Sequence, residues 1–553
     1  MIEKTKEIRD RVLENYSAKV YRNRKQHILA LGQEESDEIQ ANTRAIPGVI
    51  TQRGCCFAGC KGVVLGPISD NAIIVHGPIG CSFYTWGTRR HKQVETDRHG
   101  EHADAYIEYC FTTDMQESNI VFGGDNKLKE AITECMELFH PKLISICSTC
   151  PVGLIGDDIH AVAKWARDKY QGLMCIAFSC EGYKGVSQSA GHHIASNQII
   201  RYMIGTGDHK PEKKFSVNLL GEYNIGGDGW ETEKLLSRCG IEIVSALTGT
   251  SSYRDIKNAH LADLNLVQCH RSINYVADMM KDKYGMDWLK VNFIGIEATK
   301  QSLRAIGAYF NDKELSERME AVILDEESAI AEEVEYYKSK LKGKTAAIYV
   351  GGSRSHHFQK LLQDLGMKTI MAGYEFAHRD DYEGRKVIPE IKPDADSKNI
   401  ETLKIDPDEK FYRDNRISKE LRAKLIADPM VDLNEYAGMI DDMEEGSIIT
   451  DDLNHYETEK LLNELNPDVF FSGIKDKFIV QKNGMLSKQI HSYDYSGPYT
   501  CFQGAVKFGH DLVMGLYVPA WSFVNIPWKQ SKGLKAEFAE QTQKEEKEVL
   551  VNA

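Results

Sequence analysis

Residues 143–151 read LISICSTCP, and this stretch indicates the fold class of the whole chain. A short, nearly continuous apolar run is followed at once by a Ser-Thr-Cys-Pro turn. Such a run is typical of a parallel strand that is covered on both faces. The turn, which contains Cys150, would then lie at the carboxyl end of the strand, where open parallel sheets bind their ligands.

The same pattern recurs along the chain. Further strands are predicted at residues 216–220, 242–247, 264–267, 291–294, 346–350, 368–371 and 469–472. Longer helical stretches separate them, such as residues 314–341 with their dense Glu and Lys face. This alternation is the signature of βαβ units, so we expect an α/β fold of three Rossmann-like domains, each a mostly parallel sheet flanked by helices.

The predicted domains cover residues 45–213, 214–343 and 344–495, after an N-terminal arm over residues 1–44. The arm is charged and weakly patterned, which is typical of frayed helices. Residues 384–445 are polar and rich in Asp and Lys, and they read as a surface insertion in the third domain. Residues 496–553 are expected to pack back on the first domain.

The composition excludes several classes of protein. The 553 residues carry 68 Lys+Arg against 82 Asp+Glu, a net charge of −14, which disfavours a nucleic-acid binder. No run of 18 apolar residues occurs, so no membrane partner is expected, and the charged N-terminus is not a signal peptide. We therefore expect a cytoplasmic protein, whose 13 Cys do not form a disulfide framework.

Common cofactor and hydrolase motifs are absent from the sequence. No G-x-G-x-x-G follows a predicted strand, and neither H-E-x-x-H nor G-x-S-x-G occurs. Gly343, Lys344 and Thr345 look like the end of a phosphate loop, but Lys338 stands where that loop needs a glycine. The chain itself is therefore expected to bind no ATP.

Cations gather where predicted strands end. Arg271, Arg354 and Lys475 follow strands, and Arg89 and Arg90 lie in a Gly-rich stretch. Burying cations is costly unless something anionic lies between them. A surface ion pair is the commoner explanation for any single Arg, whereas the group together favours an anionic ligand at this edge of the sheets.

Three cysteines lie in Gly-rich or strand-end turns. Cys55, Cys81 and Cys150 are spaced too irregularly for a zinc knuckle or a ferredoxin repeat. Three thiolates are one short of a four-cysteine site, which suggests a cluster shared with another chain. Two alternatives stay open here: buried thiols in tight turns, and a redox dithiol formed by the C-x-x-C pair Cys147 and Cys150.

Two histidines are further candidates. Gln188 and His192 fall four apart at a predicted helix start, on one face, where His192 could donate protons near neutral pH. A structural role is the better interpretation for His193. His491 is a candidate ligand, although a lone His usually is not one.

Together these segments resemble the alpha-subunit family of molybdenum-dependent nitrogenases, from about Ala45 to Trp528. The matching motifs occur in family order: R-G-C-x-x-A-G-x-K-G-V-V, H-G-P-x-G-C, C-P-x-G-L-I-G-D-D, C-E-G-[FY]-x-G-V-S-Q-S-x-G-H-H, G-[DE]-Y-N-I-G-G-D, N-L-V-x-C-x-R-S, G-Y-E-F-A-H and H-S-x-D-Y-S-G-P-Y. The Cys180-Glu181-Gly182 segment is similar to the molybdenum type rather than the vanadium or iron-only type.

The resemblance implies two metal clusters in the cleft between domains. An eight-iron, seven-sulfur P-cluster would be shared with a beta chain, with Cys55, Cys81 and Cys150 as its ligands here. An iron–molybdenum cofactor, with seven irons, nine sulfides, an interstitial carbon and homocitrate, would be bound by the Cys269 thiolate and the His491 imidazole.

The resemblance also implies a shell around this cofactor. Catalytic roles are implied for His192, Gln188, Val63 and Arg89: proton relay, contact on the homocitrate side, access to the reacting iron face, and charge compensation. Further cofactor-binding residues are implied by position: Tyr223, Arg271, Ser272, Gly351, Gly352, Arg354, Glu375, Phe376 and Lys475.

The implied reaction is reduction of dinitrogen to ammonia, with protons reduced to dihydrogen alongside. An ATP-hydrolysing iron protein would supply the electrons to an alpha2-beta2 heterotetramer, in agreement with the missing ATP motif. The long stretch between His378 and Gly473 resembles the inserted, clostridial type. Gln268 and His270 depart from the residues common beside the cofactor cysteine, which leaves the tuning of the cofactor open.

Three alternatives compete with this interpretation. A cofactor-assembly scaffold generally lacks the molybdenum-ligating His, so His491 with Gln188 and His192 favours the enzyme. A vanadium or iron-only nitrogenase alpha chain differs near the first Cys and before the Gln-Ser-x-Gly-His-His motif. A cluster-free α/β binding protein would leave the cysteines without a role.

Overall fold

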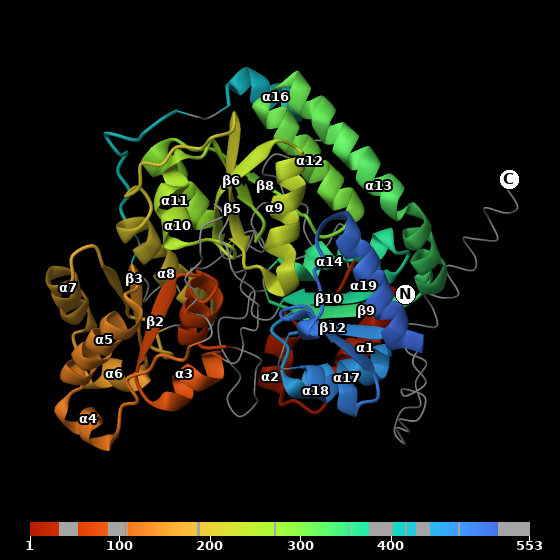
Figure 1. Cartoon of the computed structure of the whole chain (residues 1–553). Helices are drawn as coiled ribbons and strands as arrows, with labels where there is room; N and C mark the ends of the chain where they lie inside the picture. The colour runs from red at the N-terminus through yellow and green to blue at the C-terminus, as the bar shows by residue number, and fades with distance from the viewer. Residues whose placement is uncertain are drawn as a thin grey trace, which may run out of the picture. The chain divides into compact units, whose positions relative to one another are not determined.

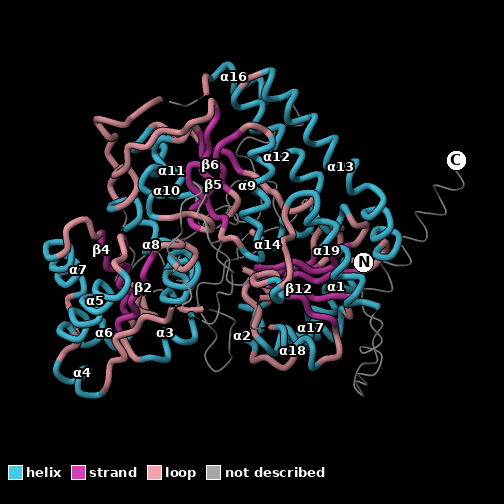
Figure 2. Tube along the Cα trace, viewed as in Figure 1, coloured by secondary structure: helices cyan, strands magenta, loops and turns pink. Residues whose placement is uncertain are grey.

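The structure is a computed structural model. It describes residues 1–32, 54–86, 106, 109–184, 188–269, 273–351, 353–374, 401, 403–414, 417–426, 443–473 and 476–517. The chain forms two compact units: unit 1 comprises Met1–Gln52, Lys290–Lys392 and Arg422–Ala553, and unit 2 comprises Arg53–Leu289 and Pro393–Leu421. Three sheets with helices beside them make up the described residues, which confirms the α/β class with mostly parallel sheets (Figures 1 and 2).

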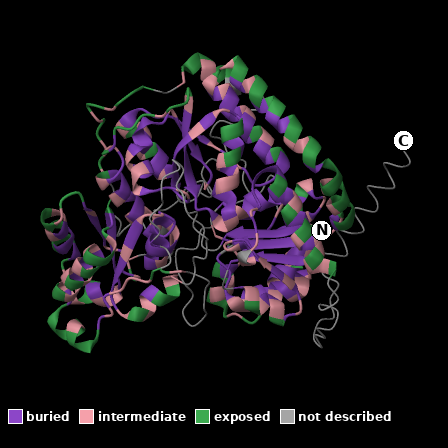
Figure 3. Cartoon of the chain, in the orientation of Figure 1, coloured by how far each residue is buried: buried purple, intermediate pink, exposed green. Residues whose placement is uncertain are grey.

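The first sheet of unit 2 has the order β2-β3-β4, and its strands are parallel. Its strands are β2 (Asn71–His76), β3 (Leu143–Ser148) and β4 (Met174–Phe178). Its helices are a π-helix (Ala58–Leu65), α3 (Ile79–Trp86), α4 (Glu117–Phe122), α5 (Asp125–Phe139), α6 (Cys150–Ile155), α7 (Ile159–Lys169) and α8 (Gln188–Tyr202). The strands are buried over most of their length (Figure 3), as is typical of parallel strands that are covered on both faces.

Successive residues of β3 face two different cores. Ile144 and Ile146 pack with residues of α5 and α7 in one core. Leu143 and Cys147 pack with the π-helix and α8 in the other. This alternation follows from the two-residue period of a strand, and it directs Cys147 away from the surface.

The second sheet of unit 2 has the order β6-β5-β7-β8. Its strands are β5 (Phe215–Glu222), β6 (Ile241–Thr248), β7 (Leu264–Val267) and β8 (Trp288–Lys290), and its helices are α9 (Asp228–Arg238), α10 (Tyr253–Asn258) and α11 (Asn274–Tyr284). β5 pairs in parallel with both β6 and β7. The strands predicted at residues 216–220, 242–247 and 264–267 are therefore confirmed.

The strand predicted at residues 291–294 is wrong. These residues follow β8 without joining a sheet, although Val291 and Phe293 are buried. Side chains, and not a neighbouring strand, bind the backbone N–H groups here. The backbone N–H of Asn292 donates to the Ser302 hydroxyl at 2.8 Å, and the Asn292 side-chain oxygen accepts from the Ile294 N–H at 2.8 Å. The apolar run reflects burial in the core, with side chains satisfying the backbone.

The sheet of unit 1 has the order β1-β11-β10-β9-β12-β13. Its strands are β1 (Ile28–Ala30), β9 (Thr345–Val350), β10 (Lys368–Tyr374), β11 (Ile448–Asp451), β12 (Val469–Ser472) and β13 (Leu486–Gln489). Its helices are α1 (Ile2–Leu13), α2 (Ala18–Arg24), α12 (Ile296–Phe310), α13 (Lys313–Leu341), α14 (Arg354–Asp364), α17 (His455–Leu465), α18 (Lys477–Lys482) and α19 (Cys501–Tyr517). Every pairing is parallel except that of β1 with β11.

The N-terminal segment packs more extensively than an arm of frayed helices would. Ile8, Val12 and Leu13 of α1 are buried in one core with Leu461 and Phe470. β1 adds an antiparallel edge strand to the sheet. The buried side chains recur at a helical spacing, which the high charge of the segment obscures in the sequence.

The described part of the C-terminal segment, residues 496–517, belongs to unit 1. Phe508 of α19 packs against Phe358 and Phe471, at ring centroid distances of 5.4 and 5.6 Å. Burial of this apolar face stabilises α19 within unit 1. The packing of residues 496–553 on the first predicted domain stays a prediction.

The insertion is described in part, including the helix α16 (Lys419–Ile426). Its residues 403–414 belong to unit 2, although the strands on either side of the insertion, β10 and β11, belong to unit 1. Arg413 donates its backbone N–H to the Tyr284 carbonyl at 2.9 Å, and the centroids of the Phe411 and His260 rings lie 4.4 Å apart.

In the described parts of the chain, no helix has the length and apolar character needed to cross a bilayer. The boundaries of the three domains stay a prediction.

Candidate metal centres

The structure brings the three predicted cluster cysteines together in unit 2. A Cβ atom placed on Gly182 would lie 3.0 Å from the Cys150 Sγ and 3.6 Å from the Cys55 Sγ. Burial raises the pKa of the Cys81 thiol, and the nearby Cys150 and Cys55 sulfurs raise it further. Thiolates that act on one another in this way repel, so the three residues form one site that would favour a bound cation.

Adjacent strands position two of these cysteines. Cys150 is the first residue of α6, directly after β3, and Cys81 lies in α3, after β2. The two strands are neighbours in the sheet, so the segments that follow them meet at one edge. Thr149 joins these segments, because its hydroxyl donates to the His76 carbonyl at 2.9 Å.

A buried histidine also ties the segments together, and the sequence reasoning missed it. The His76 ring nitrogens lie 3.0 Å from the Thr113 hydroxyl and 3.0 Å from an Asp157 carboxylate oxygen. Burial lowers the pKa of His76, although the Asp157 carboxylate opposes this shift. The signal was available, since His76 and Asp157 both belong to quoted motifs that contain cluster cysteines.

The three cysteines reach the surface of unit 2 among apolar side chains. Cys55 is exposed, and Cys81 and Cys150 are half-buried. Large apolar side chains on the same helices and in the Gly182 segment are exposed: Ile79 at 56%, Phe83 at 56%, Tyr84 at 76%, Leu154 at 76% and Tyr183 at 51%. We call these five residues the apolar patch. Exposed apolar groups of this kind mark interaction sites.

The predicted cofactor cysteine follows β7. Cys269 is half-buried, two residues beyond the end of the strand. It packs on the end of β5, because a Cβ on Gly221 would lie 2.5 Å from the Cys269 Cβ. Gly221 has φ +77°, a conformation that suits glycine, so both the space and the backbone require it. Gln268 beside it is buried and donates its backbone N–H to the Leu220 carbonyl at 2.9 Å.

Several residues of the predicted cofactor shell lie in unit 2. Gln188 begins α8, and the ring of His192 lies 6.1 Å from the ring of buried Tyr223. Val63 lies half-buried in the π-helix. The Gln188 side chain packs against Gly54, since a Cβ there would lie 2.2 Å from the Gln188 amide nitrogen. Gln188 therefore lies beside the segment that carries Cys55.

The other predicted ligand, His491, lies in unit 1 after β13. Its Nε2 lies 3.3 Å from the carbonyl oxygen of Gly351, which follows β9. Arg354, the first residue of α14, donates to the hydroxyl of buried Tyr493 and lies 5.1 Å from the centroid of its ring. Sequence reasoning missed Tyr493, although it lies in the same quoted motif as His491.

The remaining predicted site residues lie outside the described residues. They are Arg89, Arg271, Ser272, Gly352, Glu375, Phe376 and Lys475. His270, which departs from the family pattern, also lies there. The structure tests neither their positions nor their roles.

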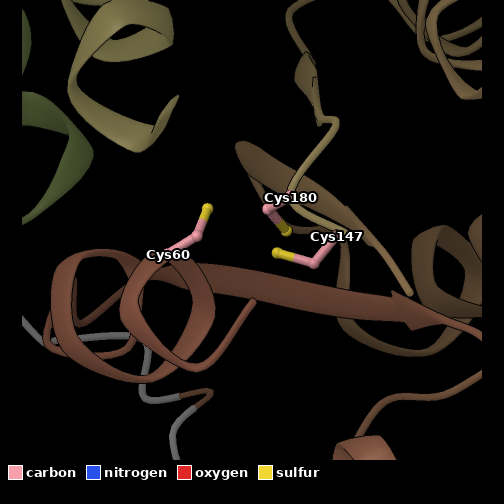
Figure 4. A group of neighbouring side chains, drawn as sticks. All are labelled: Cys60, Cys147 and Cys180. Carbon is pink, nitrogen blue, oxygen red and sulfur yellow. The ribbon is translucent and has the colours of Figure 1, made fainter. Parts of the chain in front are cut away.

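A second group of three cysteines is brought together that the sequence reasoning did not single out. The sulfur atoms of Cys60, Cys147 and Cys180 all lie within 4.8 Å of one another, and all three residues are buried (Figure 4). Cys147 therefore belongs to this inner group, whereas Cys150 belongs to the outer one. The two halves of the C-x-x-C motif point into different environments, which disfavours the redox-dithiol alternative.

Comparisons with known proteins agree with this geometry. A family model described as nitrogenase component 1 type oxidoreductase matches residues 55–517. The nitrogenase molybdenum-iron protein alpha chain of Clostridium pasteurianum is 54% identical over 525 residues, which are 95% of this chain and 97% of the relative. That of Methanosarcina barkeri is 50% identical over 531 residues, 96% of this chain and 98% of the relative.

A solved structure gives the same result. The structure of nitrogenase Cp1 at pH 6.5 is similar with a TM-score of 0.88 and 54% sequence identity, over 94% of this chain and 100% of the other. The insertion resembles that of clostridial enzymes, and the chain as a whole is 54% identical to a clostridial relative. The chain belongs to the nitrogenase component 1 type oxidoreductases and, among them, to the molybdenum-iron protein alpha chains.

Proposed function

We propose that this chain carries the site at which dinitrogen is reduced to ammonia, with protons reduced to dihydrogen alongside. The observation that carries the proposal is the convergence of Cys55, Cys81 and Cys150 at one edge of the first sheet. Membership among molybdenum-iron protein alpha chains supports this function over a vanadium enzyme and over an assembly scaffold.

The three converging cysteines fit a P-cluster. Thiolates are the ligands that iron–sulfur clusters prefer, and neighbouring cluster irons would remove the repulsion between them. The site lies at the surface of unit 2, with Cys55 exposed, so ligands from a second chain can complete it. We infer that Cys55, Cys81 and Cys150 hold an eight-iron, seven-sulfur cluster whose other ligands come from a beta chain.

The apolar patch supports the same partner. Five large side chains beside the cluster cysteines are half or more exposed, which is costly in water. A beta chain that supplies cluster ligands would cover them at the same time. We therefore infer an alpha-beta pair built around the cysteines, within an alpha2-beta2 heterotetramer.

Cys269 and His491 fit the second metal group, the iron–molybdenum cofactor. A thiolate suits a terminal iron and an imidazole suits molybdenum. If His491 donates its Nε2 proton to the Gly351 carbonyl, its Nδ1 carries the lone pair that a metal ligand needs. When bound, the two groups would supply electron storage and a metal surface for the reduction.

The surrounding side chains would orient and protonate the substrate. His192 lies one turn after the start of α8, beside the ring of Tyr223, so we assign the proton relay to it. Tyr493 restrains the Arg354 guanidinium by a hydrogen bond and ring contact, which would hold a positive charge against an anionic cofactor. Arg89, Arg271, Ser272, Gly352, Glu375, Phe376 and Lys475 stay predicted members of this shell.

The electron donor is proposed to be a separate, ATP-hydrolysing iron protein. The sequence of this chain contains no phosphate loop that would let it use ATP itself. We place the complex in the cytoplasm, where a reducing environment keeps thiols available as ligands.

Metal analysis of the anaerobically purified complex tests the ligand assignments. We expect Cys269→Ala and His491→Ala to lose at least about tenfold in molybdenum, because each removes one of two protein ligands. Iron should fall to the share that the P-cluster carries. Cys239→Ala and His510→Ala, at a buried thiol and an exposed imidazole elsewhere, should keep their molybdenum.

Three outcomes would contradict the proposal. Normal molybdenum in both ligand variants would refute Cys269 and His491 as ligands. Vanadium in place of molybdenum in the unsubstituted complex would identify a different enzyme. Molybdenum without ammonia formation, in the presence of the iron protein and ATP, would point to a scaffold.

A further inference from the structure

Three cysteines that the proposed function leaves unused meet inside unit 2. Cys60 lies in the π-helix, Cys147 in β3, and Cys180 two residues after β4, so they come from three different elements (Figure 4). Their Sγ atoms all lie within 4.8 Å of one another, and each residue is 0% exposed. This inner group is separate from the outer group formed by Cys55, Cys81 and Cys150.

The inner group lies in the larger apolar core of unit 2. Val64, Phe178 and Ile199 belong to the same core. The sulfur of Cys180 also lies 3.6 Å from the Ser148 carbonyl oxygen. Three thiols this close together in such a core form a preorganised set of soft donors.

A buried cation stands next to the group. Lys61 follows Cys60 in the π-helix and is 8% exposed. Its ammonium acts on the Cys147 sulfur, so it would offset part of the excess negative charge of a three-thiolate site.

We propose that Cys60, Cys147 and Cys180 bind one soft, three-coordinate metal ion of the Cu(I) class. An ion in the plane of three sulfurs, at about 2.3 Å from each, needs sulfurs about 4 Å apart, which fits a single ion and not a larger cluster. Each thiol that becomes a thiolate ligand would release its proton to solvent, and the ion would bind as Cu(I) with no change in oxidation state.

The number of donors selects the ion. Zinc in structural sites takes four ligands, and thiolates also select Cu(I). Within the part of the chain that the structure describes, no fourth His, Cys, Asp or Glu ligand atom joins the three sulfurs. The geometry therefore favours Cu(I) over Zn(II).

The test uses the complete complex, purified anaerobically from cells supplied with copper and then washed with a Cu(I) chelator. Copper, zinc and iron per alpha chain are measured in the same sample. We expect about one copper per alpha chain, and a loss of at least about tenfold in the double variant Cys60→Ser, Cys180→Ser. Cys135→Ser and Cys175→Ser are matched controls, because both are buried thiols outside the group, and they should keep the copper.

X-ray absorption at the copper edge of the unsubstituted complex gives a second measurement that needs no variant. Three sulfur neighbours and no nitrogen neighbour are expected. No copper in the unsubstituted complex, equal copper in the double variant, or zinc in place of copper would each overturn the proposal. The iron content separates this site from the P-cluster. If the double variant loses copper but keeps its iron, the two sites are distinct. If the unsubstituted complex itself lacks iron, that result counts against the proposed function and not against the copper site.

Discussion

The inner and outer groups of cysteines use some of the same elements of unit 2, yet they meet opposite environments. Cys147 and Cys150 are three residues apart at the end of β3, and Cys55 and Cys60 are five apart at the π-helix. The inner residues are fully buried, whereas the outer ones are exposed or half-buried. The face of the strand or helix on which a cysteine lies therefore decides what its sulfur can bind, more than the motif around the cysteine does.

The difference extends to how the thiols are satisfied. In the inner group the three sulfurs lie within 4.8 Å of one another, all of them are buried, and all belong to this chain. In the outer group the Cys81 thiol is affected by burial and by two like neighbours, which raise its pKa. A bound cation would remove this repulsion, and a partner chain would cover the exposed apolar patch, as the proposed function expects.

The largest expected effect comes from breaking the outer group. Cys150→Ala removes a proposed cluster ligand, so we expect iron of the proposed P-cluster to be lost and ammonia formation to fall at least about 100-fold. Cys147→Ala, three residues earlier, should keep this iron and most of the activity, because it belongs to the inner group. Iron content and ammonia formation measure both effects. Equal losses in the two variants would mean that the groups act as one site.

A smaller effect is expected from crowding the outer group without removing a ligand. In Gly182→Ala the new Cβ would lie 3.0 Å from the Cys150 Sγ and 3.3 Å from the Cys55 Cβ, so these ligands must shift. We expect activity to fall about tenfold, because small displacements of a reactive geometry are costly. Gly80→Ala is the matched control beside Cys81, since among the described residues its Cβ would meet only Tyr84, at 3.9 Å. Unchanged activity and iron in Gly182→Ala would place the cluster away from this glycine.

The smallest effect concerns the histidine that links the two strand ends of the outer group. The pKa of His76 is lowered by burial, so the unfolded chain protonates first as the pH falls below about 6.5. The stabilisation from neutral His76 is present above that pH and is lost on acidification. His76→Asn should therefore destabilise the complex by up to about 1 kcal/mol more near pH 7.5 than near pH 5.5.

Thermal melting at the two pH values measures this difference. His510→Asn serves as the control, because that side chain is 56% exposed in the His510–Asp511 pair. A destabilisation by His76→Asn that is larger at the acidic pH would reverse the sign and reject a neutral, buried His76.

Local patterns predicted much of the fold. The predicted bounds of β7 and β12 match the structure residue for residue, because short apolar runs between polar turns leave little freedom. β2 and β4 carry similar runs, but no strand was predicted there, since periodicity alone cannot separate a short buried strand from a buried helix segment. Residues 291–294 show the reverse error, where an apolar run is buried without a sheet partner.

The metal sites divide in the same way. The sequence by itself determined the family, which the comparisons confirm. It also singled out the three outer cysteines and predicted the thiol and imidazole donors, because motifs and residue types are local properties. Only the tertiary structure decided that Cys60 and Cys180 join Cys147, and that Thr113 and Asp157 hold His76. These contacts join residues far apart in sequence, and their formation depends on strand pairing and on the direction of each side chain, which no local pattern encodes.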